Sequence, residues 1–219
     1  GTVTAQTLNS SGLPELTAQM TWPWRGAYWH YLTGVRGLLD APREWFYDSV
    51  TSKLSLWSPD GAPPLNVSAK QRLYCADLTD RSHITLRGLT LFAGTITTSS
   101  FSEGVTLDRL KASYLSHSVT LPPLPPSAQA VGTDQFWVLA SRAHHSGIQL
   151  RGRGHILQNS TLLGSAGNAV LLEGSEHVVT NNLIQDTAYI GSYAAPIRLN
   201  GSGHRVVANT IVGAGRDSI

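Results

Sequence analysis

The sequence has few charged residues, one cysteine and no long apolar run, and each shortage excludes a class of protein. Only 14% of the 219 residues are charged, and Lys and Arg are scattered along the chain, so we expect no nucleic-acid-binding surface. Cys75 is the single cysteine, which excludes an internal disulfide, and its apolar neighbours predict a buried, inert thiol. No run of 18 apolar residues occurs, so we expect no membrane-spanning segment.

A short phrase of alternating apolar and polar residues occurs three times and ends each time in glycine. The phrases are residues 147–152 (Gly-Ile-Gln-Leu-Arg-Gly), 169–174 (Ala-Val-Leu-Leu-Glu-Gly) and 196–201 (Pro-Ile-Arg-Leu-Asn-Gly). The fourth position of each phrase is leucine, and it recurs after 22 and then 27 residues, from Leu150 to Leu172 to Leu199. Short strands on a period near 22 residues predict an all-β fold, a right-handed parallel β-helix in which each repeat forms one coil.

Alternation within the phrases predicts which side chains enter the core. One core row should hold Ile148, Val170 and Ile197, and the next Leu150, Leu172 and Leu199, with Gln149 and Arg151 pointing outward. A leucine-rich repeat would need more closely spaced leucines and a helical arc in each turn. A β-sandwich would not repeat the same polar positions in step.

Two polar rows accompany the phrases. A histidine follows each phrase leucine by five residues (His155, His177, His204), and Leu78 and His83 keep the same offset upstream. An asparagine follows each of the three phrase histidines (Asn159, Asn181, Asn209). We interpret both rows as ladders at turns, with side chains bonded between coils, because no carboxylate shares the row as a metal site would require.

The chain divides into a lead-in and a solenoid. Residues 1–72 hold most of the aromatic residues and are predicted to form an N-terminal cap with a small antiparallel unit at 44–48 and 53–57. Residues 73–219 are predicted to form the coils, with a proline-rich excursion at about 115–146. Because the chain stops where another coil should open, we expect a truncated solenoid whose end contacts missing residues or another chain.

Several segments resemble bacterial secreted proteins of the pectate-lyase-like superfamily of right-handed parallel β-helices. They are residues 39–48, residues 56–61, and the run from Asn181 through Ile211 to Arg216. Arg43 stands where the pattern usually has glycine, so an altered turn is expected there. The resemblance implies a secreted or periplasmic location and an extracellular polysaccharide as partner, but it does not choose among lyases, hydrolases, epimerases and members without known activity.

The chemistry of these reactions selects the candidate site residues. A lyase needs a base and a cation that neutralises a uronate carboxylate, whereas a hydrolase needs two facing carboxylates. Glu173, Asp186 and Asp217 fall in different rows, so the sequence shows no carboxylate pair, and it indicates no metal site and names no cofactor. The catalytic candidates are His145, Asp186, Tyr189 and Arg216, and the substrate-binding candidates are Tyr193, Arg198 and Asp217, most of them around the expanded turn at 186–193.

Two classes of function therefore stay open from the sequence. The first is a secreted enzyme that acts on an acidic extracellular glycan, as a lyase or a glycoside hydrolase. The second is a noncatalytic solenoid that binds glycan or serves a structural role. In both, we expect the expanded turn and Arg198 to line a groove for an anionic sugar.

Overall fold

The computed structural model describes residues 2–8, 10–12, 14–19, 34–68, 70, 72–116, 146–189 and 194–215. The chain divides into two compact units, residues 1–67 and 68–219. The role of the first unit as a cap stays a prediction.

The described residues of the first unit form two antiparallel pairs and one short helical turn. Strands β1 (Thr2–Leu8) and β2 (Pro14–Gln19) form a pair that the sequence did not predict, and a 3-10 helix η1 (Arg36–Leu38) follows. Strands β3 (Trp45–Asp48) and β4 (Lys53–Leu56) pair antiparallel over the residues predicted to do so. Arg43 has a φ of 75°, the left-handed conformation that glycine favours, and its amide donates to the Trp57 carbonyl. The turn therefore keeps a glycine-type backbone although arginine occupies it.

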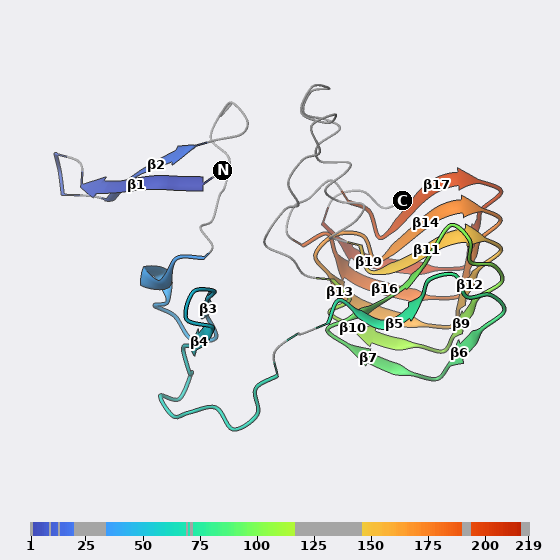
Figure 1. Cartoon of the computed structure of the whole chain (residues 1–219), viewed down its shortest axis with the longest axis horizontal. Helices are drawn as coiled ribbons and strands as arrows, with labels where there is room; N and C mark the ends of the chain where they lie inside the picture. Colours follow the sequence, from blue (N-terminus) through green and yellow to red (C-terminus); the bar gives the residue numbers. More distant parts are fainter. Residues whose placement is uncertain are drawn as a thin grey trace. The chain divides into compact units, whose positions relative to one another are not determined.

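The described residues of the second unit form a right-handed parallel β-helix of five coils, numbered in chain order, each contributing one strand to each of three parallel sheets (Figure 1). Sheet 1 contains β5 (Tyr74–Leu78), β8 (Thr95–Thr98), β11 (Ile148–Arg153), β14 (Val170–Ser175) and β17 (Ile197–Ser202). Sheet 2 contains β6 (Thr85–Arg87), β9 (Thr106–Asp108), β12 (Ile156–Gln158), β15 (Val178–Thr180) and β18 (Arg205–Val207). Sheet 3 contains β7 (Thr90–Phe92), β10 (Lys111–Ser113), β13 (Thr161–Ser165), β16 (Leu183–Thr187) and β19 (Thr210–Ala214).

The predicted core rows are confirmed. Strand register aligns Ile148 with Val170 and Ile197, and Leu150 with Leu172 and Leu199. All of these except Leu199 are fully buried, whereas Leu199, on the last coil, is 45% exposed. Alternation with period two thus places every second side chain of the phrase in the core.

Coils 2 and 3 pair directly although the chain between them leaves the coil period. Strand β8 pairs with β11, β9 with β12 and β10 with β13, while Ser116 and Ser146 bound the intervening segment in the described chain. Most of the predicted proline-rich excursion at about 115–146 falls on residues 117–145, which lie outside the described residues.

Three histidines stack at the corner between sheets 1 and 2. The rings of His155, His177 and His204 follow one another with centroids 4.9 Å apart and planes within 8°. Each Nδ1 accepts the amide N–H of the preceding coil, from Val105, His155 and His177 in turn, and each Nε2 faces the carbonyl four residues earlier. Each imidazole is therefore neutral, with its hydrogen on Nε2.

The histidine row is thus a ladder, as predicted, but His83 does not belong to it. Thr106 donates its amide to the Ile84 carbonyl, so Ile84 and Val105 continue the row upstream. His83 lies one position earlier, exposed, with a φ of 55° beside Gly104. A constant offset from leucine missed this because the turn after β5 is one residue longer: Ile84 follows Leu78 by six residues, whereas His155 follows Leu150 by five.

The asparagine ladder needs a similar correction. Strand register pairs Asn182, not Asn181, with Asn209. Asn159 and Asn181 occupy a left-handed bend (φ 54° in both) on the outside, where the Asn181 amide donates to Asn159 Oδ1 at 2.8 Å. The inner row is Ser160, Asn182 and Asn209, whose side-chain oxygens accept amide N–H groups from Leu110, Ser160 and Asn182. The predicted row had merged these two adjacent rows.

Glycines at the end of each phrase permit close stacking of the coils. Gly152, Gly174 and Gly201 have φ values of 108°, 116° and 126°, and a Cβ on each would overlap a carbonyl oxygen of the preceding coil. Any side chain here would force neighbouring coils apart. The recurring glycine in the phrase is therefore a structural requirement of the solenoid.

Candidate functional site

A row of left-handed residues bends the chain at sheet 3, directly after β7 and β10 and inside β13, β16 and β19. Its members have φ between 53° and 73° and are Ala93, Tyr114, Gly164, Asp186 and Gly213. Such a bend turns the side chain away from the core. The row therefore displays Tyr114 and Asp186 on the same edge, two coils apart, or about 10 Å at the usual strand spacing.

Three exposed aromatic rings gather along this edge, and we call them the aromatic ridge: Phe92, Tyr114 and Tyr189. Phe92 and Tyr114, on successive coils, make an edge-to-face contact with centroids 5.6 Å apart. The Tyr114 ring then extends over coil 3, where the glycine at position 164 leaves room for it. The three side chains are 62%, 53% and 46% exposed, so the ridge presents ring surface to solvent.

Tyr189 joins the ridge from coil 4. Its hydroxyl donates to the Ser116 carbonyl at 3.4 Å, across from coil 2. Burial, and to a smaller extent the nearby Tyr114 phenol, raises the pKa of Tyr189. The phenol therefore stays protonated at neutral pH and can donate a hydrogen bond, but it is poorly suited to act as a base.

Arg198 lies elsewhere, on the outer face of sheet 1. Strand register places it after Thr97, Gln149 and Leu171 in one row. These three are at most 4% exposed, so the outer face is covered along this row. The structure thus brings Asp186 and Tyr189 to one edge, whereas Arg198 belongs to another sheet.

The other outward row of sheet 1 holds an ion pair. Arg151 Nε lies 2.6 Å from Glu173 Oε2, and both side chains are largely screened from solvent. Glu173 and Asp186 lie on different sheets, as their sequence positions predicted. The remaining candidates, His145, Tyr193, Arg216 and Asp217, lie outside the described residues.

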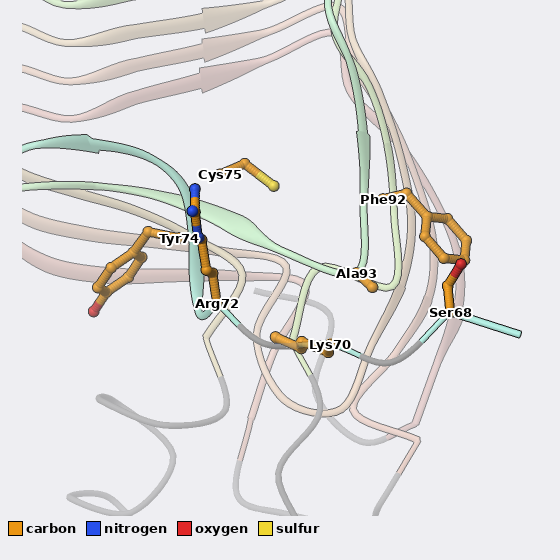
Figure 2. Close-up of a pocket in the computed structure, with 7 residues that line it drawn as sticks. All are labelled: Ser68, Lys70, Arg72, Tyr74, Cys75, Phe92 and Ala93. Carbon is orange, nitrogen blue, oxygen red and sulfur yellow. The ribbon is translucent and has the colours of Figure 1, made fainter.

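A pocket of about 520 Å³ opens beside the first coil (Figure 2). Its lining comes from the lead into β5, from β5 itself and from the end of β7, and comprises Ser68, Lys70, Arg72, Tyr74, Cys75, Phe92 and Ala93. Phe92 belongs to both the pocket and the aromatic ridge, so the two features are continuous. Cys75 is exposed here, which shows that the prediction of a buried thiol is wrong. It occupies an outward position of β5, the strand whose Leu78 enters the core.

No metal centre is found among the described residues, where no three His, Cys, Asp or Glu side chains converge. The histidine stack is the densest group of potential ligands, but every Nδ1 already accepts a backbone N–H. Its nitrogens serve the backbone and are not available to an ion.

The pocket cations and two of the three ridge rings were not predicted from the sequence. Ser68, Lys70, Arg72 and Tyr74 occupy alternate positions, a pattern that indicates one common face of an extended chain. That alternation could have predicted the pocket. Phe92 and Tyr114 are separated by 22 residues, the coil period itself, and could have been read as neighbours.

No described helix has the length and apolar character needed to cross a membrane. Comparison of the chain with protein-family models, with curated proteins and with solved structures found no match.

Proposed function

We propose that this chain is the β-helix of a secreted or periplasmic protein that acts on an acidic extracellular polysaccharide. The observation that carries the proposal is the aromatic ridge, in which Phe92, Tyr114 and Tyr189 present exposed rings along one edge of the solenoid. Rings held by coils 1, 2 and 4 form a platform parallel to the solenoid axis, and an extended polymer can follow it.

Sugars suit such a platform because their rings carry an apolar face of C–H groups and an equatorial rim of hydroxyls. An aromatic ring can cover the apolar face, while polar groups nearby bind the rim. Asp186 lies on the same edge and supplies a carboxylate acceptor, and the protonated Tyr189 phenol supplies a donor. The ridge therefore combines stacking surface with hydrogen-bonding groups of both kinds.

The resemblance to the pectate-lyase-like superfamily supports the same proposal. The coil period near 22 residues and the three parallel sheets agree with that architecture. The glycine-type backbone at Arg43 agrees with the family pattern of glycine before Glu-Trp. Membership of that superfamily is part of the proposal.

Cleavage of the bound glycan is the finer part of the proposal, with β-elimination ahead of hydrolysis. In it, Tyr189 would act as an acid or hydrogen-bond donor, since its raised pKa disfavours the phenolate. The base would come from His145, and Arg216 or Arg198 would neutralise a uronate carboxylate.

A noncatalytic glycan-binding solenoid is the second candidate. It is favoured by the described part of the edge, where Asp186 is the one carboxylate in its row. Affinity without chain cleavage would identify this alternative.

Affinity electrophoresis in gels containing acidic or neutral polysaccharides tests the proposal. Phe92→Ala and Tyr114→Ala should each weaken retention about tenfold, since one stacked ring is worth roughly 1.5 kcal/mol. Phe101→Ala is the matched control, because Phe101 is 83% exposed and lies in the turn after β8, off the ridge. Unsaturated products absorbing in the ultraviolet would identify a lyase, and new reducing ends without them a hydrolase. Equal retention of all three variants and the unaltered protein would refute the ridge as a glycan platform.

A further inference from the structure

The pocket beside coil 1 contains two cations for which the described residues provide no ion pair. Lys70 and Arg72 both line it. The ion pairs of the described chain involve other basic side chains, Arg87, Arg109, Arg151 and Arg153. Among the described residues, no carboxylate therefore pairs with Lys70 or Arg72, in contrast to Arg151 and Arg153 on the coils.

The Lys70 side chain is exposed, but its ammonium group is partly desolvated by neighbouring atoms. Burial lowers the pKa of its ammonium group, and the one opposing influence is the Cys75 thiol. A partly desolvated ammonium without a counterion is stabilised when an anion binds beside it. The pocket is thus prepared electrostatically for a negatively charged group.

The rest of the lining suits a sugar ring. Figure 2 shows Phe92 and Ser68 at one side of the pocket and Arg72, Tyr74 and Cys75 at the other, with Lys70 and Ala93 between them. Phe92 supplies apolar surface, and Ser68 and Tyr74 supply hydroxyl groups. The volume of about 520 Å³ lies within the range of small-molecule sites.

We propose that this pocket binds the carboxylate or sulfate group of an acidic sugar at the end of the aromatic ridge, and so selects acidic over neutral glycans. The inference rests on the proposed function, because Phe92 connects the pocket to the ridge. A glycan stacked along the ridge would reach Lys70 and Arg72 where it passes Phe92. Asp186, two coils beyond Tyr114, would accept hydrogen bonds from uncharged hydroxyl groups of the same glycan.

The pocket contains its own reporter, because Cys75 is the single cysteine of the chain and lines the pocket. The rate of Cys75 labelling by an uncharged maleimide can be measured in the unaltered protein. The measurement is repeated in the presence of each of three sugar probes. These are a galacturonate trisaccharide, a sulfated galactan oligosaccharide and a neutral galactose trisaccharide. We expect one or both acidic probes to slow labelling several-fold and the neutral probe to leave it unchanged, and the more effective acidic probe identifies carboxylate or sulfate as the preferred group.

Charge-removing variants test the assigned cations. Lys70→Gln and Arg72→Gln should each raise the half-protecting concentration of the effective acidic probe about tenfold, the loss of one charge-assisted contact. Arg205→Gln is the matched control, because Arg205 is exposed on sheet 2. Far-UV circular dichroism establishes that each variant keeps its fold, and the labelling of the unaltered protein tests the proposal without any variant.

The outcomes separate this inference from the proposed function. If acidic polysaccharide retards the protein in gels but no acidic probe protects Cys75, the ridge binds glycan and the pocket inference is wrong. Equal protection by neutral and acidic probes would refute charge selection. If no polysaccharide retards the protein in gels and no probe protects Cys75 from labelling, both proposals fail.

Discussion

The histidine stack should make the stability of the β-helix depend on pH in a defined window. His177 is fully buried, and burial lowers its pKa to about 4 from 6.5. Between these values the unfolded chain binds a proton that the folded chain does not, so the folded state loses stability as the pH falls from 6.5 towards 4. At about 1.4 kcal/mol for each pH unit, the full loss from this one ring is about 3 kcal/mol.

The variant His177→Asn should remove this dependence while keeping the hydrogen bond. At the next corner Asn182 and Asn209 accept backbone N–H groups through Oδ1 at 2.9 and 3.0 Å, the same role that His177 Nδ1 performs for His155. The smaller side chain should cost about 1 to 3 kcal/mol at neutral pH, because a gap replaces part of the ring stack. Below pH 6.5, however, the variant has no proton to take up at this position.

Denaturant unfolding followed by far-UV circular dichroism at pH 7.5, 6.5, 5.5 and 4.5 measures both effects. Carboxylates titrate alike in the two proteins, so the difference between their pH slopes isolates position 177. His83→Asn is the control, because His83 is exposed, has a left-handed φ that asparagine tolerates, and lies outside the stack. Parallel pH profiles for the unaltered protein and His177→Asn would show that the stack is not the source of acid sensitivity.

Two further predictions follow from the other stacked rows. Gly174→Ala should cost about 3 kcal/mol or more, because alanine must adopt a φ of 116° and its Cβ overlaps the Gly152 carbonyl, whereas Gly154→Ala, with open space around it, should cost about 1 to 2 kcal/mol. Thermal melts of both variants check this, and similar melting temperatures would contradict the role of the glycine row. Asn182→Ala should cost about 1 to 3 kcal/mol because it leaves the buried Ser160 amide without its acceptor, while exposed Asn181→Ala should change stability by less than about 0.5 kcal/mol. Urea midpoints test this pair, and a larger loss for Asn181→Ala would restore the ladder first predicted.

The solenoid could be predicted from the sequence because equivalent positions of each coil make the same contacts and therefore need the same types of residue. Inward positions such as Leu150 and Leu172 must be apolar, and the tight bend after them must be glycine, so both recur at the coil period. The same logic predicted that the phrase histidines stack. It failed by one residue at His83 and Asn209, because a side chain's row is set by backbone pairing and by left-handed bends, which a constant offset does not record.

The candidate site was less predictable, since its members come from different coils and from the chain before them. Asp186 and Tyr189 were found because they flank an expanded turn, yet Arg198, nearby in sequence, lies on another sheet. Lys70 and Arg72 belong to no repeat, so periodicity could not single them out.

What the sequence determined by itself is therefore the period, the core rows and the coil architecture, all of which depend on contacts that repeat identically along the axis. Only the tertiary structure decided which outward side chains meet solvent. Gln149 and Leu171 are buried on an outer face, whereas Cys75, in an apolar stretch, is exposed. The physical reason is that alternation specifies the direction of a side chain, but its exposure depends on whatever other part of the molecule covers that face.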